Sequence, residues 1–326
     1  MLKFGTLGAA RITPEALIDP CRETGAASVV AVAARDRARA EAFAKTHGIA
    51  KVYESYEDVI ADPEIDAIYN PLPISAHCDW TIKALAASKP VLCEKSFASN
   101  TAEAQLMHEK AEATGLVLMD AFHYRYHPVF ARAIEIYQSG VLGDNINIDA
   151  VFQVAITDEN DIRMRYDTAG GVTMDIGCYP LSWVRHLTGM EPTAVEAEAV
   201  VGPPDVDVAL RTRLAFDNGV TATTAGDMRE GVETKALLRV TGDTGEMIVT
   251  NPIAPQYGHN IRVTVNGRST DETLDRRPTY SYQLDAFIAA VREGAPIATD
   301  GADAVKQMAL IDRCYKSAGL PLRGMP

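Results

Sequence analysis

The sequence has little positive charge. Lys and Arg account for 31 of its 326 residues, against 44 Asp and Glu, which gives a formal net charge of −13 at pH 7. Nucleic acids and anionic membranes favour basic surfaces, so this balance argues against both as the main partner. An anionic small ligand would have to be held locally, by backbone N–H groups and a few arginines.

Cysteine pairs and long apolar runs are also missing. The five cysteines are scattered, with no C-x-x-C or Cys/His spacing: Cys21, Cys78, Cys93, Cys178 and Cys314. This pattern argues against a disulfide framework and a structural zinc site, and it predicts reduced thiols. No apolar run reaches the roughly 18 residues of a membrane-spanning helix. The first residues lead straight into an apolar strand without the features of a signal peptide, so we expect a cytoplasmic protein.

The first 122 residues alternate between apolar strands and helices. The expected strands are 2–8, 28–34, 67–69, 90–93 and 117–119, and the expected helices are 37–47, 75–88 and 100–114. Strands that alternate with helices of about ten or more residues indicate βαβ units and a parallel sheet. The sequence therefore predicts a doubly wound α/β domain over residues 1–122.

The pattern changes in residues 123–326. From Ile146 to Ile156 every second residue is apolar, and the other face carries Asn145, Asn147, Asp149 and Gln153. Similar strands are expected at 194–201, 207–216, 219–225, 235–241, 245–250 and 261–266. Two helices follow, one with Leu284 and Phe287, the other with Met308 and Ile311, at helical spacing. We expect a second α/β domain with a large, mostly antiparallel open sheet, one face of which is solvated or covered by a partner.

A loop of small residues connects the first strand to the first helix. Residues 8–13 read Gly-Ala-Ala-Arg-Ile-Thr and match the dinucleotide fingerprint G-x-G-x-x-G only at Gly8. Small residues here would let backbone N–H groups and the helix N-terminus approach a pyrophosphate. We therefore take Gly8, Ala9, Ala10, Arg11 and Ile12 as candidate nucleotide-binding residues. An ordinary tight turn is the alternative.

The end of the second strand distinguishes NAD from NADP. In NAD enzymes an acidic residue about 20 residues after the loop bonds the ribose 2′-hydroxyl. Here Arg35 takes that place, and Arg39 lies one helical turn beyond it. Arginine pairs with a 2′-phosphate and stacks on adenine, which favours NADP(H) over NAD(H). Asp36 is the contrary signal, and a solvated arginine at a helix start is the alternative.

A charged pair follows the apolar strand at 90–93. Glu94 and Lys95 come directly after Val91-Leu92-Cys93, and ligands bind at the carboxyl ends of parallel strands. A partly desolvated lysine beside a cationic nicotinamide would have a lowered pKa, suited to proton transfer near neutral pH. A surface ion pair is the alternative.

Taken together, these segments resemble a known enzyme family. The resemblance rests on Glu94-Lys95, on 120–128 (DAFHYRYHP), on 170–179 (GGVTMDIGCY), on 69–73 (YNPLP) and on Tyr282-Gln283. They are similar, in this order along nearly the whole chain, to the glucose–fructose oxidoreductase/inositol dehydrogenase/rhizopine catabolism family. Residues 30–36 (VAVAARD) also resemble its NADP-dependent dihydrodiol dehydrogenase branch. The resemblance implies a Rossmann domain followed by an α/β domain with a large open sheet that binds substrate and forms oligomers.

The resemblance also implies roles for individual residues. Lys95 stands at the family's central acid/base lysine, and Asp175 and Tyr179 stand at its Asp-x-x-x-His/Tyr positions. Tyr179 would donate to the reacting oxygen, with Lys95 stabilising its ionised form, and Asp175 would orient a substrate hydroxyl. The candidate cofactor-binding residues at the later strand ends are Asn70, Pro71, Leu72, Pro73, His77, Glu94 and Lys95. The candidate substrate-binding residues are His123, Tyr124 and Arg125.

The sequence departs from the family pattern at two positions. Ser96 replaces the usual proline, and a cis bond before a non-proline residue costs about 2.5–4 kcal/mol, so either the surroundings enforce it or Lys95 sits differently. Tyr179 replaces the histidine found in much of the family, whose unperturbed pKa suits proton transfer at neutral pH. Lys95 would then carry more of the proton transfer.

The remaining candidates have simpler interpretations. His77 and His123 belong to no compact metal-ligand spacing, so no metal site is expected. His77 would line the nicotinamide side or cap its helix. Tyr124 and Tyr126 have core packing as the alternative. Arg163 and Arg165 have two interpretations, side chains that reach the pocket and a solvated arm, of which we favour the second.

The sequence thus predicts hydride transfer between NADP(H) and a secondary alcohol or ketone of a sugar, cyclic polyol or vicinal diol. One alternative is an NAD(P)-binding sensor or regulator without turnover, against which the joint retention of Lys95, Asp175 and Tyr179 speaks. Another is a hydrolase or lyase assisted by tightly held NAD, against which Arg35 speaks. The polar outer sheet face predicts a homo-oligomer, a dimer or tetramer.

Overall fold

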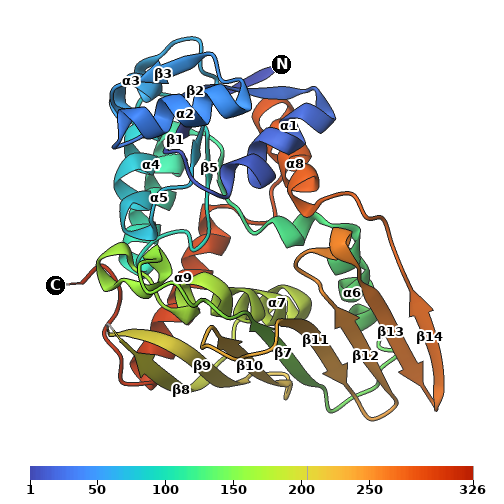
Figure 1. Ribbon diagram of the computed structural model, residues 1–326. Coiled ribbons are helices and arrows are strands. Elements are labelled where there is room, and N and C mark those ends of the chain that lie inside the picture. The colour runs from blue at the N-terminus through green and yellow to red at the C-terminus, as the bar shows by residue number, and fades with distance from the viewer. Residues whose placement is uncertain (204, 326) are drawn as a thin grey trace. The chain divides into compact units, whose positions relative to one another are not determined.

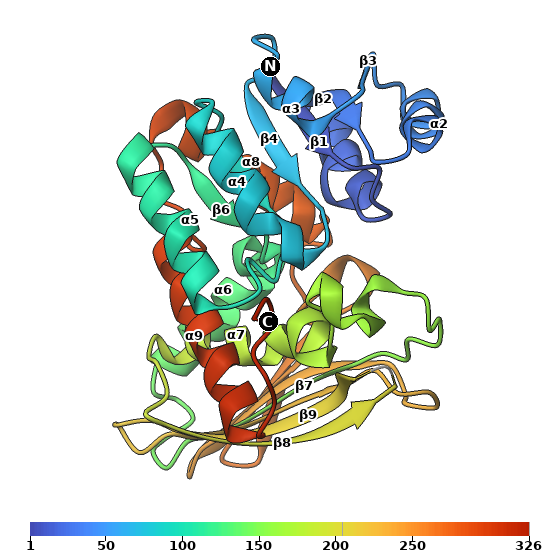
Figure 2. The same cartoon turned by 90° about the vertical axis from the view of Figure 1, so that its left-hand side faces the viewer.

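The structure, a computed structural model, describes residues 1–203 and 205–325. The chain divides into two compact units (Figures 1 and 2). Unit 1 comprises Met1–His123 and Tyr280–Val305, and unit 2 comprises Tyr124–Thr279 and Lys306–Pro326. The division expected after residue 122 differs from this mainly in the late segment Tyr280–Val305, which lies in unit 1.

Unit 1 is built on a six-stranded parallel sheet in the order β3-β2-β1-β4-β5-β6. The strands are β1 (Leu2–Leu7), β2 (Ala27–Ala33), β3 (Lys51–Tyr53), β4 (Ala67–Asn70), β5 (Val91–Cys93) and β6 (Leu118–Asp120). This is the strand order of Rossmann dinucleotide-binding domains, with the change of direction between β1 and β4. Because β1 pairs with β4 and β4 with β5, the loops that follow these three strands emerge side by side.

Helices connect the strands of unit 1. They are α1 (Asp19–Thr24), preceded by the π-helical turn Pro14–Ile18, and α2 (Arg37–His47), α3 (Tyr56–Ala61), α4 (His77–Ala86) and α5 (Thr101–Thr114). The predicted bounds of α2 are confirmed, because Asp36 caps its start through the Arg39 N–H and Gly48 ends it with φ 75°. β3 and α3 were not expected from the sequence.

The late segment joins unit 1 through helix α8 (Thr279–Glu293). Phe287 on α8 packs against Phe4 on β1 with ring centroids 5.5 Å apart. Further along, the Thr299 hydroxyl donates to the Asp120 carbonyl at 2.6 Å, and the Asp120 N–H donates to the Thr299 carbonyl at 2.9 Å. These contacts explain why a sequence boundary at residue 122 separates residues that fold together.

Unit 2 is built on an eight-stranded sheet in the order β14-β13-β12-β11-β7-β10-β9-β8. The strands are β7 (Asn147–Gln153), β8 (Ala194–Gly202), β9 (Val206–Ala215), β10 (Thr221–Asp227), β11 (Lys235–Thr241), β12 (Gly245–Thr250), β13 (Asn260–Val265) and β14 (Arg268–Glu272). All neighbours are antiparallel except β7 and β10, which confirms the expected mostly antiparallel sheet. β14 was not expected.

Helices α6 (Pro128–Gln138) and α7 (Cys178–Thr188) belong to unit 2, and α9 (Gly301–Ser317) begins in unit 1 and ends in unit 2. Ile148 and Ala150 of β7 are fully buried, whereas Asn147 and Asp149 are half-buried on the other face, so the predicted alternation is seen in the first part of this strand. Figure 2 shows α7 on one face of the sheet, and in the described part of unit 2 the opposite face is not covered by a helix.

Among the described residues, no helix combines the length and apolar character needed to cross a bilayer. The same residues hold no group of three or more His, Cys, Asp or Glu side chains arranged to bind a metal ion. All five cysteines are buried, free thiols.

Candidate active site

The loop after β1 requires its first glycine. Gly8 has φ 102°, a conformation that L side chains rarely adopt, and a Cβ there would lie 3.3 Å from the Leu72 side chain. The Gly8 N–H donates to the Ala33 carbonyl at 2.7 Å, which fixes the loop to the end of β2. Ala9 is buried, Ala10 and Ile12 are half-buried and Arg11 is exposed.

This loop fits a nucleotide pyrophosphate. The two residues after Gly8, Ala9 and Ala10, are small, so the chain leaves room for a ligand before the helical turn that begins at Pro14. The Thr13 hydroxyl at this helix start is buried and has no hydrogen-bond partner in the described part of the chain. A buried hydroxyl without a protein partner is consistent with a site that a polar ligand completes.

The end of β2 shows what Asp36 does. Its carboxylate accepts the Arg39 N–H at 3.3 Å as the N-cap of α2, which explains an acidic residue beside Arg35 without a ribose contact. Arg35 is exposed. Arg39 reaches back to the nucleotide loop, where its guanidinium donates to the Ala9 carbonyl at 2.8 Å.

Arg35 also lies near the Tyr56 side chain. Burial raises the pKa of Tyr56, and the positive charge of Arg35 opposes that shift, so the two residues are neighbours. The Tyr56 ring meets the Trp80 ring edge-on at 4.9 Å. A cation beside aromatic surface is a suitable environment for an adenine with an attached phosphate.

Asn70 organises the loop after β4. Its side-chain nitrogen donates to the Thr81 hydroxyl at 3.1 Å and to the His77 carbonyl at 3.3 Å, and its side-chain oxygen Oδ1 accepts the Leu72 N–H at 3.4 Å. Pro71 is buried, and Leu72 and Pro73 are half-buried. The loop is therefore tied to the start of α4.

His77 connects this loop to the one after β5. Its ring is fully buried, with Nε2 2.7 Å from the Leu72 carbonyl oxygen and Nδ1 3.0 Å from the Ser96 carbonyl oxygen. Burial lowers the pKa of His77 to about 4. The ring thus bridges the loops that carry Pro71–Pro73 and Lys95. It does not cap its own helix, which was one of the two interpretations of the sequence.

The segment after β5 places Glu94 inside the protein. Glu94 is buried and accepts the Tyr69 hydroxyl at 2.7 Å, so its carboxylate lies inside the protein rather than on the surface. Burial, together with the charge of Glu94, raises the pKa of Tyr69 well above its usual value. Lys95 is half-buried. The Lys95–Ser96 peptide bond is cis although Ser96 replaces the family's proline, which is the first of the two possibilities stated for this position.

Asp175 and Tyr179 lie together in unit 2. Asp175 is in a π-helical turn, Thr173–Gly177, that continues directly into α7, where Tyr179 lies in the first turn. π-Helical turns within helices are rare and occur often at functional sites. Tyr179 is buried in an aromatic cluster with Phe152, Tyr124 and Trp183, with ring centroids 5.7–6.5 Å apart.

The predicted substrate residues fall in different environments. The His123 ring stacks on Tyr280 at 4.0 Å within unit 1. Tyr124 is fully buried in unit 2, with its hydroxyl 2.7 Å from Ser182 Oγ and 2.9 Å from His186 Nδ1. Arg125 is half-buried, and its Nε is buried without a hydrogen-bond partner in the described residues, which leaves a donor for a ligand.

Arg163 differs from the solvated arm that we favoured from the sequence. Rather than lying in solvent, its guanidinium binds the buried Asp161 and contacts Asp175. The spacing Asp161-x-Arg163 was the available signal, but a local pair of this kind does not reveal the third partner 12 residues away. Arg165, its neighbour, is exposed as expected.

Comparison with known proteins places this geometry in a family of enzymes. The profile described as "Oxidoreductase family, NAD-binding Rossmann fold" matches residues 2–122, and that of the "GFO/IDH/MocA C-terminal domain" matches residues 130–248. D-xylose 1-dehydrogenase (NADP(+)) 2 of Haloferax volcanii is 34% identical over 321 residues, 97% of each chain. Trans-1,2-dihydrobenzene-1,2-diol dehydrogenase of Xenopus tropicalis is 34% identical over 189 residues, 58% of this chain and 57% of that one.

A solved structure agrees over the whole length. The 3-ketoreductase from Actinomadura kijaniata, in complex with NADP and TDP-benzene, matches with a TM-score of 0.91 at 26% identity and covers 97% of both chains. The protein is therefore an oxidoreductase with a nicotinamide-nucleotide-binding Rossmann domain. It belongs to the glucose–fructose oxidoreductase/inositol dehydrogenase/rhizopine catabolism family, which confirms the resemblance seen in the sequence.

Proposed function

We propose that the protein is an NADP(H)-dependent dehydrogenase or reductase that interconverts a secondary alcohol and a ketone on a sugar, cyclic polyol or vicinal diol. The observation that carries this is the placement of Lys95. It follows β5 beside the buried Glu94, at the sheet edge where the nucleotide loop of β1 and the Asn70–Pro73 loop of β4 also emerge. NADP(H), when bound, supplies or accepts the hydride.

The chain's own residues bind the cofactor, orient the substrate and transfer the proton. The loop Gly8–Ile12 holds the pyrophosphate, Arg35 and Arg39 hold the 2′-phosphate, and Asn70–Pro73, His77 and Glu94 shape the nicotinamide side. Lys95 bonds the reacting oxygen and exchanges a proton with it or with Tyr179. Asp175 orients a substrate hydroxyl, with His123, Tyr124 and Arg125 contributing to the substrate site.

The test is a screen of purified protein with NADP+ and, separately, NAD+ against aldoses, inositols and dihydrodiols, followed through nicotinamide absorbance. Turnover with NADP+ and at least one of these substrates is expected. Binding of NADP(H) without any turnover would favour a sensor. Product release without net change in the nicotinamide would favour an NAD-assisted hydrolase or lyase.

The preference for NADP(H) over NAD(H) can be tested with a variant of Arg35 and a matched control. Replacing Arg35 with Asp removes a cation from the expected 2′-phosphate site and adds a carboxylate that suits a ribose hydroxyl. NADPH is expected to bind more tightly than NADH in the parent and more weakly in the variant, as measured by fluorescence titration. Arg37→Asp, on the same helix start but ion-paired with Glu41, is the control and should preserve the order. Equal affinity of the parent for both cofactors would contradict the assignment.

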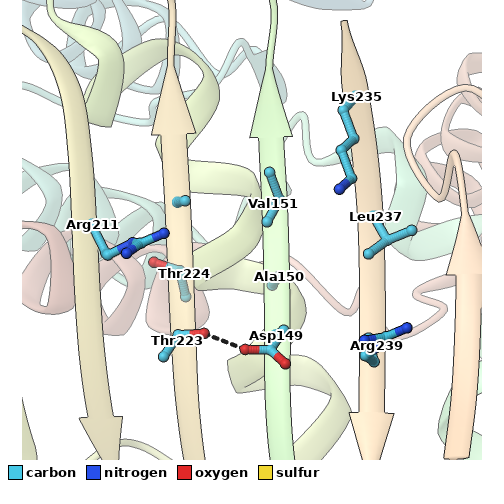
Figure 3. A pocket seen from close by; sticks show the side chains of 10 residues that line it. Asp149, Ala150, Val151, Arg211, Thr223, Thr224, Lys235, Leu237 and Arg239 are labelled. Atoms are coloured by element: carbon cyan, nitrogen blue, oxygen red, sulfur yellow. Dashed lines mark hydrogen bonds between the residues drawn. The ribbon is translucent and has the colours of Figure 1, made fainter. Parts of the chain in front are cut away.

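The outer face of the unit 2 sheet supports a homo-oligomer. Charges of both signs lie on it, including Arg213 with Glu196 and Arg239 with Glu246. A hollow of about 380 Å³ lies in this face, bordered by Arg211, Asp149, Lys235 and Arg239. Figure 3 shows the side chains that line it. A face with both signs of charge can pair with its own copy about a two-fold axis. Sedimentation should show a dimer or tetramer at micromolar concentration, and a monomer alone would refute this.

The free, buried thiols support a cytoplasmic location, which remains part of the same proposal.

A further inference from the structure

Arg163 is fixed at one end by a buried carboxylate. Its Nε and Nη2 donate to the two oxygens of Asp161 at 2.8 and 2.9 Å, and its backbone N–H donates to the same carboxylate at 3.0 Å. The Asp161 side chain is only 2% exposed. A bidentate pair with one partner buried holds the guanidinium in a single orientation.

The backbone of Arg163 is joined to the turn that carries Asp175. Its carbonyl accepts the Gly171 N–H at 2.8 Å, and the Gly171 carbonyl accepts the Asp175 N–H at 3.1 Å. A Cβ on Gly170 would lie 2.5 Å from the Arg163 carbonyl oxygen, so only glycine permits this approach. Arg163 and Asp175 are therefore parts of one rigid local structure.

The remaining arm of the guanidinium reaches Asp175. Nη1 lies 3.3 Å from Asp175 Oδ2, with the two side chains 34% and 16% exposed. The hydrogen bonds with Asp161 and the charge of Asp175 raise the pKa of Arg163. A fixed positive charge beside Asp175 favours its ionised form, which only accepts hydrogen bonds.

Arg165, two residues further along the chain, makes a similar ion pair with Asp167 at the surface. It binds Asp167 through Nε at 3.0 Å and Nη2 at 2.5 Å, but the two side chains are 52% and 66% exposed. The same residue type thus pairs with a neighbouring carboxylate in both places. Only Arg163 connects that pair to Asp175.

We propose that Arg163 is a positioning residue that holds Asp175 ionised and oriented to accept a hydrogen bond from a substrate hydroxyl adjacent to the reacting carbon. This inference rests on the proposed function and names the substrate group that Asp175 recognises. The enzyme favours substrates that carry a hydroxyl next to the alcohol or ketone that reacts, and it discriminates against deoxy analogues that lack it. A site that hydrogen-bonds a substrate hydroxyl rejects such an analogue strongly because its own polar group is then left unpaired.

The experiment compares Arg163→Met with Arg165→Met on two substrates, the best one found in the screen and its analogue without the adjacent hydroxyl. Arg163→Met should lower kcat/KM for the hydroxylated substrate by about 10- to 100-fold, the range expected for a hydrogen bond to a charged group. It should change kcat/KM for the deoxy analogue by less than about threefold, so that discrimination between the two is lost. Arg165→Met should behave as the parent on both.

Two further variants separate positioning from folding. Arg163→Lys keeps the charge without the planar fork and should recover part of the lost discrimination. In an Asp175→Asn background, Arg163→Met should have little further effect, because the two residues act through the same contact. NADPH affinity, measured by fluorescence titration, should be equal in all variants.

Equal losses on both substrates, or an Arg163→Met enzyme that matches Arg165→Met, would overturn the inference while leaving the proposed function intact. A parent that reduces or oxidises no sugar, polyol or diol would instead overturn the proposed function, and this inference with it.

Discussion

Replacing Lys95 with Met is expected to lower kcat by about 10²–10⁴-fold, the usual contribution of general acid–base catalysis. Methionine retains much of the side-chain volume but has no charge and none of the three donors of the ammonium group. The affinity for NADP(H) should change far less, since the nucleotide loop and Arg35 are untouched. Steady-state kinetics and a cofactor titration measure the two quantities independently.

Lys45→Met, at an exposed position on α2, is the control for loss of a lysine in unit 1. Turnover by Lys95→Met within about threefold of the parent would show that Lys95 is not the acid/base residue. Loss of NADP(H) binding or of folding would make Lys95 a cofactor ligand or a structural residue. Tyr179 would then be the first candidate for proton transfer.

The second large effect concerns a buried ion pair in unit 2. Arg323 and Asp207 are 1% and 0% exposed, with Nη2 and Oδ1 2.5 Å apart. Asp207 also accepts the N–H and hydroxyl of Thr173, and Arg323 donates to the Gly170 carbonyl at 2.7 Å. The pair therefore holds the segment that leads into the Asp175 turn.

Arg323→Met is expected to destabilise unit 2 by about 3–5 kcal/mol, because it leaves a buried carboxylate without its cation. Burial already raises the pKa of Asp207, and the charge of Arg323 opposes that rise. Without Arg323 the folded-state pKa rises further above the unfolded value. Stability of the variant should therefore fall as pH rises from about 4 towards that pKa.

The chain offers a clean reporter for this measurement. It has two tryptophans, Trp80 in unit 1 and the fully buried Trp183 in unit 2. In a Trp80→Phe background, fluorescence during urea unfolding follows unit 2 alone. Arg262→Met, which breaks the exposed Arg262–Asp271 pair, is the control and should cost no more than about 1 kcal/mol. An equal effect of the two variants would refute the assigned role of Arg323.

Local sequence signals predicted most of the fold. Strands β11 and β12 have the predicted bounds because a short turn with Gly242 and Asp243 separates two short runs rich in apolar residues. β3 has only three residues, too few for any periodicity to appear. β14 reads Arg-Ser-Thr-Asp-Glu, without an apolar residue, and becomes a strand only because it pairs with β13.

The candidate site was predictable where it follows strand ends. Gly8, Asn70 and Glu94 each come directly after a buried strand or end one, and parallel strands bring such positions to one edge. The contacts that fix the site were not predictable in this way. His77 binds a carbonyl 19 residues away, and Arg323 binds a carboxylate 116 residues away. Such pairings depend on the folded chain and leave no local pattern.

The return of α8 into unit 1 limits how this enzyme can be recombined. A chimaera that exchanges only residues 1–122 would separate Phe4 from Phe287 and Asp120 from Thr299. The α8 of this chain would then have to pack against a foreign β1, whose side chains do not match those of α8. The Rossmann unit of this chain is portable only as two segments, 1–123 together with 280–305.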